Sequence, residues 1–236
     1  VSVPSDVRPD RGRFGIPNDA TAFLFAFDFS SYPARKNPAA VLRAYRQAFA
    51  ADRKRNVSLV IKTMGQCTEK DEILTAIRRL AQDDGRIVLI DKVLTRAEMH
   101  CLTASCDVFV SLHRSEGFGL GIAEAMAFGK AVIATDFSGS KDFVSSKTGF
   151  PIPYRLIDVE PDQYPYFVGG QQWADPDIGE AARIMASLAD DRDKAIAVGA
   201  EAKSFIETFH SPRAVGRVIE TRLLQIYGYR NALMER

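Results

Sequence analysis

The chain has 236 residues, 46% of them apolar and 26% charged, which is enough for one large globular domain with a buried core. Its 31 basic and 30 acidic residues are well mixed, so the composition points to neither nucleic acid nor an anionic membrane as the main partner. The first residues lack the basic start and apolar core of a signal peptide, and the longest apolar run, residues 22–27, is far too short for a transmembrane segment.

The cysteines and histidines give no sign of a metal or redox site. Cys67, Cys101 and Cys106 are odd in number and contain no CxxC pair, and the three histidines form no HExxH or similar ligand pair. Scattered thiols of this kind are typical of a reducing compartment. We therefore expect a cytoplasmic protein without a metal or other cofactor.

The first 19 residues have the composition of a linker. They are rich in Pro, Arg, Asp and Gly, with prolines at positions 4, 9 and 17. We predict that residues 1–19 are the remnant of an interdomain linker and that residues 20–236 form one domain.

Short apolar runs alternate with amphipathic stretches over the next hundred residues. The expected strands are Thr21–Asp28, Val57–Ile61, Ile87–Ile90, Val108–Leu112 and Ala131–Thr135. Expected helices follow Asn37-Pro38, cover Ile73–Ala81, run over Thr95–Ala104, and run from Leu120 to Phe128 with Gly129 as the stop. This alternation predicts the α/β class, a Rossmann-like parallel sheet with helices on both faces and right-handed crossovers.

The alternation becomes less regular after Asp136. We expect a short helix over Gly139–Val144, a short strand over Gly149–Pro153, and an irregular aromatic segment from Tyr154 to Trp173. Three C-terminal helices should pack on the sheet, and they are predicted from Asp175-Pro176 to Ala189, over Asp191–Phe209, and from Ser211-Pro212 to about Tyr227.

The stretch from Val108 to Asp136 reads as strand, glycine-rich turn, helix and strand. Gly117, Gly119 and Gly121 stand where the helix begins, and there the free backbone N–H groups and the helix dipole favour an anion. A parallel sheet places its ligands at such turns. The first strand-to-helix loop has no glycine and the chain contains no GxxxxGK[ST], so an NAD-dependent epimerase or dehydrogenase and a P-loop protein are both disfavoured.

Two glutamates lie beside this turn, Glu116 within it and Glu124 eight positions later in the helix. Carboxylates near a helix start are favourable by about 0.3–1 kcal/mol, so a purely stabilising role is one interpretation. The other interpretation is that they accept hydrogen bonds from hydroxyl groups of a ribose or hexose. Glu124 has apolar neighbours on both sides, which indicates a paired or ligand-facing carboxylate.

Basic residues lie near neighbouring strand ends. Lys36 follows the first strand, with Arg35 as an equally placed competitor, and Lys62 directly follows Ile61. In a parallel sheet these positions converge on the edge that carries the glycine turn, so they could hold a pyrophosphate. His113, in the same turn, could contact a ligand or fix the loop, and we favour the loop-fixing role.

Residues 107–144, DVFVSLHRSEGFGLGIAEAMAFGKAVIATDFSGSKDFV, resemble the donor-site segment of retaining GT-B glycosyltransferases of family 4 (glycosyltransferase group 1). Glu116 and Glu124 have the spacing of the Glu-x7-Glu motif of that family. The segments FDFSSYPARKNP and LVIKTMG resemble its phosphate-binding loops, and WADPD before the late helices, with a final helix returning across the domain, also fits.

The resemblance implies transfer of a sugar from a nucleotide-diphosphate donor with retention of configuration and without a metal. It implies that Glu116 and the turn from Gly117, with the backbone of Phe118, Gly119 and Leu120, hold the donor sugar, and that Glu124 holds the ribose. Lys36 and Lys62 would face the pyrophosphate, and the base would lie against Val93 and Leu94. It also implies a front-face reaction assisted by the donor phosphate.

The resemblance covers only the C-terminal, donor-binding half of a two-domain enzyme. We therefore expect an N-terminal acceptor-binding domain to be absent from this chain, which would bind donor without efficient transfer. The full-length enzyme could associate with a membrane through that other domain. The alternative is a non-catalytic nucleotide or nucleotide-sugar binding module.

Overall fold

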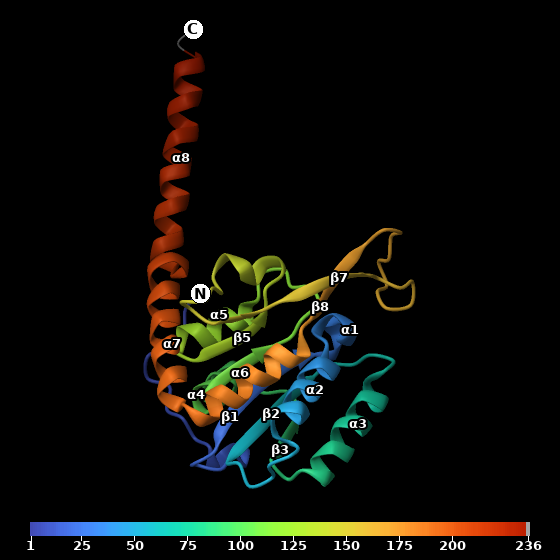
Figure 1. Cartoon of the computed structure of the whole chain (residues 1–236). Helices are drawn as coiled ribbons and strands as arrows, with labels where there is room; N and C mark the ends of the chain where they lie inside the picture. Colours follow the sequence, from blue (N-terminus) through green and yellow to red (C-terminus); the bar gives the residue numbers. More distant parts are fainter. Residues whose placement is uncertain (235–236) are drawn as a thin grey trace.

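A six-stranded parallel sheet with helices on both faces forms the body of the protein (Figure 1). The computed structural model describes residues 1–234, so the expected domain, residues 20–236, is seen except for its last two residues, which lie outside the described part. The strand order is β3-β2-β1-β4-β5-β6, and β7 and β8 form a separate two-stranded sheet. The predicted α/β class and the Rossmann-like arrangement are confirmed.

The elements of the sheet and their connections follow one another along the chain as predicted, with one short addition. They are β1 (Thr21–Asp28), α1 (Pro33–Lys36), α2 (Pro38–Phe49), β2 (Val57–Met64), α3 (Lys70–Asp83), β3 (Ile87–Asp91), α4 (Arg96–Ser105), β4 (Val108–Ser111), α5 (Leu120–Ala127), β5 (Ala131–Thr135) and β6 (Phe150–Ile152). Short 3-10 turns cover Phe29–Ser31 and Ser138–Asp142. The second turn replaces the short helix expected over Gly139–Val144.

Alternate residues of the strands fill two hydrophobic layers, one on each face of the sheet. Phe23, Phe25 and Phe27 of β1 pack with apolar residues of α2 and α3, whereas Ala22 and Leu24 pack with those of α4 and α5. Because successive side chains of a strand point to opposite faces, a strand covered on both sides must be apolar throughout. This requirement explains the continuous apolar run of β1.

The strand order reverses between β1 and β4. β1 pairs with β2 along all of its length, from Thr21 to Asp28, but it pairs with β4 only through Phe23 and Leu24. The carboxyl end of β1 therefore continues beyond its pairing with β4. Ligands of open α/β sheets bind at such a reversal, in the crevice outside the carboxyl ends of the strands.

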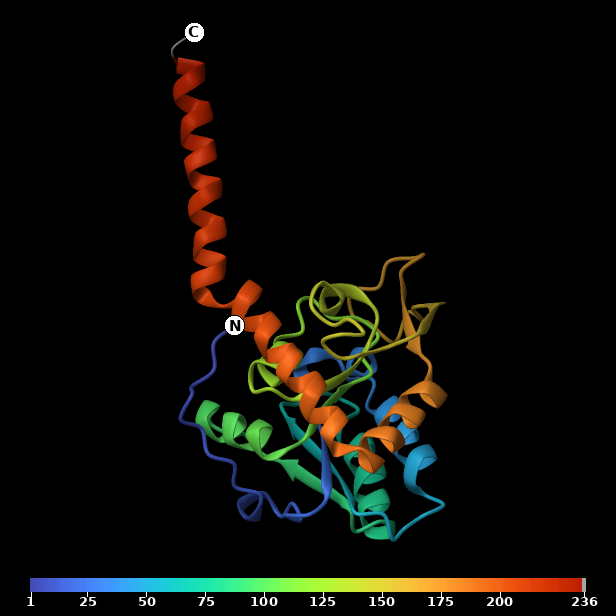
Figure 2. The same cartoon turned by 60° about the vertical axis from the view of Figure 1, so that its left-hand side comes forward.

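Of the C-terminal helices, two pack on the body and one leaves it. α6 (Ile178–Asp190) lies on α2, and α7 (Arg192–Phe205) lies on α5 and β5. After a π-helical turn, Ile206–His210, the chain enters α8 (Pro212–Met234), which projects away from the sheet instead of returning across the domain (Figures 1 and 2). α8 exposes several large apolar side chains, namely Val215, Val218, Ile219, Leu223, Leu224, Ile226 and Tyr227.

Two predicted boundaries in the last third of the chain are wrong. The segment expected to be irregular, Tyr154–Trp173, begins with β7 (Tyr154–Asp158) and leads into β8 (Gln172–Pro176), which pairs antiparallel with it. Pro176 therefore belongs to a strand, and the following helix is capped by Asp177, whose side chain accepts a hydrogen bond from the Glu180 amide. A proline fits here because it sits at the end of an edge strand.

The amino-terminal segment, expected to be a linker, is irregular except for the 3-10 turn η1 (Gly12–Phe14), but it packs against the domain. Phe14 and Ile16 are buried against the layer that contains α4 and α5. Arg11 forms an ion pair with Asp107 at 2.8 Å, which fixes the segment beside β4.

None of the helices within residues 1–234 is long and apolar enough to cross a membrane.

The contact between α7 and the turn that follows α5 gives a test of the packing. A Cβ atom added at Gly199 would lie 2.1 Å from the Gly129 carbonyl oxygen, so Gly199→Ala should force the helix away and cost about 2 kcal/mol or more of unfolding free energy. Chemical denaturation followed by circular dichroism measures this. Gly216→Ala is the control, because no atom lies within 4 Å of the added Cβ, and it should cause no loss. Equal stability of the two variants would contradict this packing.

Candidate functional site

An ion pair joins the two loops on either side of the strand reversal. Lys36, at the end of α1, places its Nζ 2.5 Å from Oε2 of Glu116, which lies in the loop after β4. Nη1 of Arg35 lies 3.6 Å from the other carboxylate oxygen. The three side chains are only 14 to 20% exposed, so the charges are largely withdrawn from solvent.

The short helix α1 is held in a defined position by its flanking residues. Tyr32 and Asn37, directly before and after it, both have positive φ, 61° and 56°, which is unusual for residues other than glycine. The buried Asn37 side chain donates a hydrogen bond to the Leu112 carbonyl at 3.1 Å and also caps α2 by accepting one from the Ala40 amide. The Arg114 amide donates to the Arg35 carbonyl at 2.8 Å, so α1 is tied to the loop after β4.

The loop that carries Glu116 is fixed from the other side by the turn after β5. The amide of Glu116 donates to Oγ of Ser138 at 2.8 Å, and its carbonyl accepts from the Gly139 amide at 3.1 Å. A Cβ at Gly139 would lie 2.0 Å from the Gly117 carbonyl oxygen, so only glycine permits this close approach.

His113 is completely buried beneath this loop. Its Nδ1 lies 3.0 Å from Oγ of Ser111, and its Nε2 lies 3.1 Å from the Phe137 carbonyl and 3.3 Å from Oγ of Ser140. Burial lowers the pKa of the imidazole, and the nearby carbonyl and Glu116 offset this only in part. These contacts agree with a loop-fixing role and leave the ring no exposed face for a ligand.

The pKa of Glu116 shows which effect dominates at the ion pair. Burial alone would raise it, but the hydrogen bond and charge of Lys36, together with the charge of Arg35, outweigh burial and hold the pKa below its ordinary value. Glu116 is therefore ionised at neutral pH, and its carboxylate can accept hydrogen bonds.

The glycine-rich turn leaves the start of α5 open. Gly119 stands at the N-cap with φ of 91°, where most side chains would be strained, and no side chain caps the helix. Phe118 and Leu120 are exposed, and Gly117 and Gly121 are exposed as well. The first amides of α5 thus face outward beside Glu116, an arrangement suited to an anion.

Lys62 does not follow a strand as expected, because β2 continues to Met64 and places Lys62 inside the sheet, in register with Ala26 and Ile90. Its side chain is only 3% exposed. Burial lowers the pKa of Lys62, and the carboxylates of Asp28 and Asp91 counteract this. Within the described residues it forms no ion pair with Glu116.

Glu124 lies on α5, one turn beyond Leu120, and is approached by a residue that the sequence analysis did not single out. Nη2 of Arg96, the first residue of α4, lies 3.7 Å from Oε1 of Glu124. Val93, which is exposed, and Leu94, which is buried, precede α4. A positive charge at the first residue of a helix interacts unfavourably with the helix dipole, so such a residue is expected to have a carboxylate or ligand partner. The position of Arg96 at the start of α4 is therefore the signal that could have identified it.

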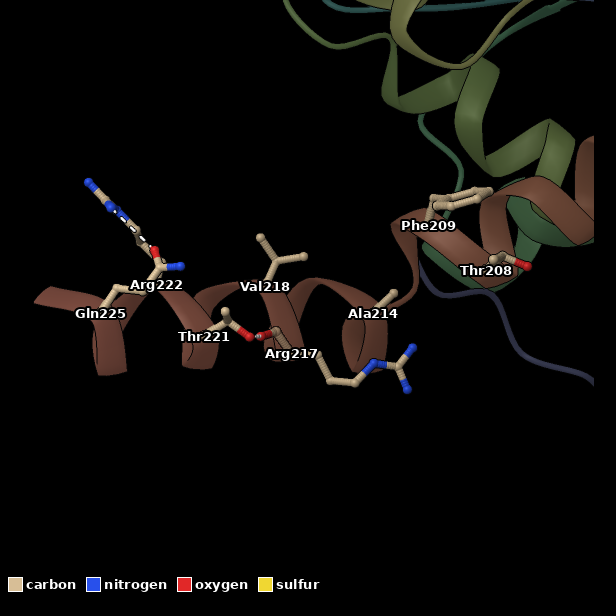
Figure 3. A pocket seen from close by; sticks show the side chains of 8 residues that line it. All are labelled: Thr208, Phe209, Ala214, Arg217, Val218, Thr221, Arg222 and Gln225. Atoms are coloured by element: carbon tan, nitrogen blue, oxygen red, sulfur yellow. Dashed lines mark hydrogen bonds between the residues drawn. The ribbon is translucent and has the colours of Figure 1, made fainter. Parts of the chain in front are cut away.

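Two hollows are not lined by Lys36 or Glu116, although Arg96 lines the second of them. One, of about 510 Å³, runs along α8 and the turn before it, where Phe209 and Val218 lie on one side of the helix and Arg217 on another (Figure 3). A second, of about 770 Å³, lies between the amino-terminal segment and α4. Among residues 1–234 no group of three His, Cys, Asp or Glu side chains is placed to bind a metal ion.

The reversal of strand order, the open helix start and the charged side chains around it define a Rossmann-like domain with a candidate site at the carboxyl edge of its sheet. The family model described as "Glycosyl transferases group 1" matches residues 22–160, which is more than half of the chain. The chain belongs to this family of glycosyltransferases.

Solved structures with the same fold support the architecture. The Anabaena protein HepE, solved with UDP and glucose, has a TM-score of 0.68 at 21% identity over 95% of this chain and 53% of HepE. Sucrose-phosphate synthase from Thermosynechococcus elongatus has a TM-score of 0.64 at 18% identity, and the match covers 93% of this chain and 48% of the synthase. The C-terminal domain of LpcC from Francisella tularensis has a TM-score of 0.62 at 19% identity, and the match covers 89% of this chain and 100% of the LpcC domain.

The chain therefore spans about half the length of HepE and of the sucrose-phosphate synthase, and the whole of the LpcC domain. No curated protein matches it in sequence.

The ion pair across the crevice should contribute measurably to stability. A double-mutant cycle with Lys36→Met and Glu116→Gln, read from chemical denaturation, should give a coupling of about 1 to 3 kcal/mol, because the pair is mostly buried. The control is Arg183→Met with Glu180→Gln, a more exposed pair on α6, for which the coupling should be much smaller because solvent screens the charges. A coupling no larger than the control's would contradict this account.

The buried imidazole predicts a pH dependence. Burial lowers the pKa of His113 in the folded state below its ordinary value of about 6.5. The stability contributed by the neutral imidazole is therefore fully present above about pH 6.5 and is lost as the pH falls through the folded-state pKa. The unfolding free energy of the wild type should therefore fall relative to that of His113→Gln between pH 7.5 and 5.5, by at most about 1.4 kcal/mol per pH unit. His210→Gln, at a partly exposed ring, is the control. A difference independent of pH would contradict a buried, neutral His113.

Proposed function

We propose that this domain binds a nucleotide-diphosphate sugar and forms the donor half of a retaining glycosyltransferase of family 4. The observation that supports this most directly is the Lys36–Glu116 pair, which joins two loops at the strand reversal beside the open start of α5. A cation and free amides suit a diphosphate, and a carboxylate suits sugar hydroxyls. One ligand that carries both groups would use the whole arrangement.

In this proposal the diphosphate lies at the start of α5, near Lys36, with Lys62 adding positive potential from within the sheet. The backbone of the turn from Gly117 to Leu120 and the carboxylate of Glu116 bind the donor sugar. Glu124 accepts the ribose hydroxyls, with Arg96 beside it, and the base lies against Val93 and Leu94. The adjacency of β1 and β4 in the sheet, with α4 leading into β4, supports this order.

The proposed reaction takes place on one face of the sugar. The acceptor hydroxyl attacks the anomeric carbon, the bond between that carbon and the diphosphate oxygen breaks, and the proton of the hydroxyl passes to the departing oxygen. Lys36 and the α5 amides stabilise the charge that develops on the leaving diphosphate, so that the reaction needs no metal. Glu116 orients the sugar and is not the nucleophile.

The proposed enzyme has a second domain that binds the acceptor. HepE is about twice as long as this chain, and α8 presents an exposed apolar side formed by Val215, Ile219, Leu223 and Ile226. These residues recur at spacings of three and four along the helix and so form one stripe. We propose that the acceptor-binding half covers this stripe, in a cytoplasmic enzyme that could reach a membrane through that half.

The alternative proposal is a non-catalytic module that binds a nucleotide or nucleotide sugar. It uses the same crevice, so the two proposals differ in transfer and not in binding. Transfer at an ordinary enzymatic rate by this chain alone would contradict the view that it needs another domain.

The two glutamates should affect different parts of the donor. Glu124→Ala should weaken binding of UDP and of UDP-glucose alike, by about 1.5–3 kcal/mol, because it removes a charged partner of the ribose. Glu116→Ala should weaken binding of UDP-glucose more than binding of UDP, because the Glu116 carboxylate contacts the sugar in this proposal. Isothermal titration calorimetry with both ligands measures this.

Glu180→Ala, on the exposed side of α6, is the matched control and should bind both ligands normally. Equal losses for UDP and UDP-glucose in both site variants would rule out this division of roles. Failure of the wild type to bind any nucleoside diphosphate or its sugar would overturn the proposed function.

A further inference from the structure

Three tyrosines from distant parts of the chain pack together at one edge of the crevice. Tyr32 lies between β1 and α1, and Tyr164 and Tyr166 lie in the loop between β7 and β8. The ring centroids of Tyr32 and Tyr164 are 5.5 Å apart, those of Tyr32 and Tyr166 6.3 Å, and those of Tyr164 and Tyr166 5.7 Å, all edge to face. Such pairs are mutually attractive, so the three rings form one cluster, here called the tyrosine cluster.

The β7–β8 hairpin that carries two of these rings is fastened to the Glu116 loop. The Arg114 guanidinium lies over the Trp173 ring at 4.9 Å, and the Ala174 amide donates to the Arg114 carbonyl at 2.9 Å. The same residue, Arg114, donates its own amide to Arg35 on α1. The tyrosine cluster and the Lys36–Glu116 pair are thus attached to one framework.

Tyr32 occupies an unusual backbone conformation, with φ of 61° and ψ of 102°. This conformation costs free energy for a residue other than glycine, and strain of this kind is concentrated at ligand sites. The Tyr32 carbonyl accepts hydrogen bonds from the amides of Arg35 and Lys36. The strained residue therefore both starts the helix that bears Lys36 and places an aromatic ring beside it.

The cluster is open to solvent and carries no positive charge. Tyr166 is 67% exposed, and Tyr32 and Tyr164 are partly exposed. The ionisable residues of the loop between β7 and β8, apart from the tyrosines, are Glu160 and Asp162, so the loop does not attract a phosphate or another anion. A neutral ligand with apolar faces and hydroxyl groups fits these properties.

We propose that the tyrosine cluster is a stacking platform for a pyranose ring of the acceptor, which would be a saccharide. The electron-rich face of an aromatic ring attracts the weakly positive C–H groups on one side of a pyranose, and phenol hydroxyls can exchange hydrogen bonds with the sugar hydroxyls. Stacked here, a saccharide lies beside the sugar that Glu116 would hold. This inference rests on the proposed function, because it takes the crevice to be the donor site.

Ligand-observed NMR tests the platform. Saturation transfer is measured from the chain to a panel of methyl glycosides of glucose, galactose, mannose and N-acetylglucosamine, with and without saturating UDP. Transfer to C–H protons of at least one glycoside is expected in both conditions. In Tyr164→Ala/Tyr166→Ala the apparent dissociation constant should rise by about two- to ten-fold, the range for loss of an aromatic contact.

Val168→Ala, which removes an exposed apolar side chain from the same loop, is the control and should bind the glycosides as the wild type does. UDP should bind both variants normally in calorimetry, which separates this proposal from the proposed function. Failure of the wild type to bind any nucleoside diphosphate or its sugar would overturn the proposed function, while transfer to the glycosides would still report on the platform.

Three outcomes would overturn the platform. The first is no transfer to any glycoside of the panel, the result expected if the cluster packs against another part of a longer protein. The second is transfer that persists unchanged in the double variant. The third is weakened binding of UDP-glucose with normal binding of UDP and no binding of free glycosides, which would place the donor sugar on the tyrosines instead of the acceptor.

Discussion

The divergence of β1 from β4 is the constraint on which the site depends. Two strands that pair only through Phe23 and Leu24 leave their carboxyl ends apart, and the loops that follow must be held across that gap by other means. The Lys36–Glu116 pair does this directly. The Asn37 side chain also donates to the Leu112 carbonyl, and the Arg114 amide donates to the Arg35 carbonyl. These two hydrogen bonds fix α1 in place, so that the ion pair forms with little further loss of side-chain freedom.

The energetics of that pair explain why it can also serve a ligand. Withdrawing two charges from water is unfavourable unless each finds a close partner, so Lys36 and Glu116 stabilise each other in the free protein. A ligand with a phosphate and hydroxyls offers both of them new partners of the right kind. The loops themselves need not move, because His113, Ser138 and the close approach at Gly139 anchor the turn from beneath. A fixed framework with exchangeable charge partners is a preorganised site.

The sequence predicted the regular part of the fold because strands buried on both faces must be continuous apolar runs, as in β1 and β4. Lys62 shows the limit of that rule, since a buried lysine inside β2 is tolerated only with Asp28 and Asp91 nearby, which no local pattern reveals. The helix α1 is four residues long and too short for periodicity, and the β7–β8 hairpin packs only partly, so its residues lack a clear alternation. The Arg96–Glu124 and Arg114–Trp173 contacts depend on how separate elements meet in space.

The Lys36–Glu116 pair lies at the carboxyl edge of the sheet. α1 follows β1 and α5 follows β4 at this edge, and apolar residues of α4 and α5 pack against one face of the sheet. α8 and the β7–β8 hairpin both project from the body on the same side, with exposed apolar or aromatic side chains (Figures 1 and 2). Exposed apolar surface of this extent is unfavourable unless something covers it. The residues of the proposed donor site therefore belong to the packed body of the domain, whereas the proposed saccharide platform is carried in part by one of these two projections.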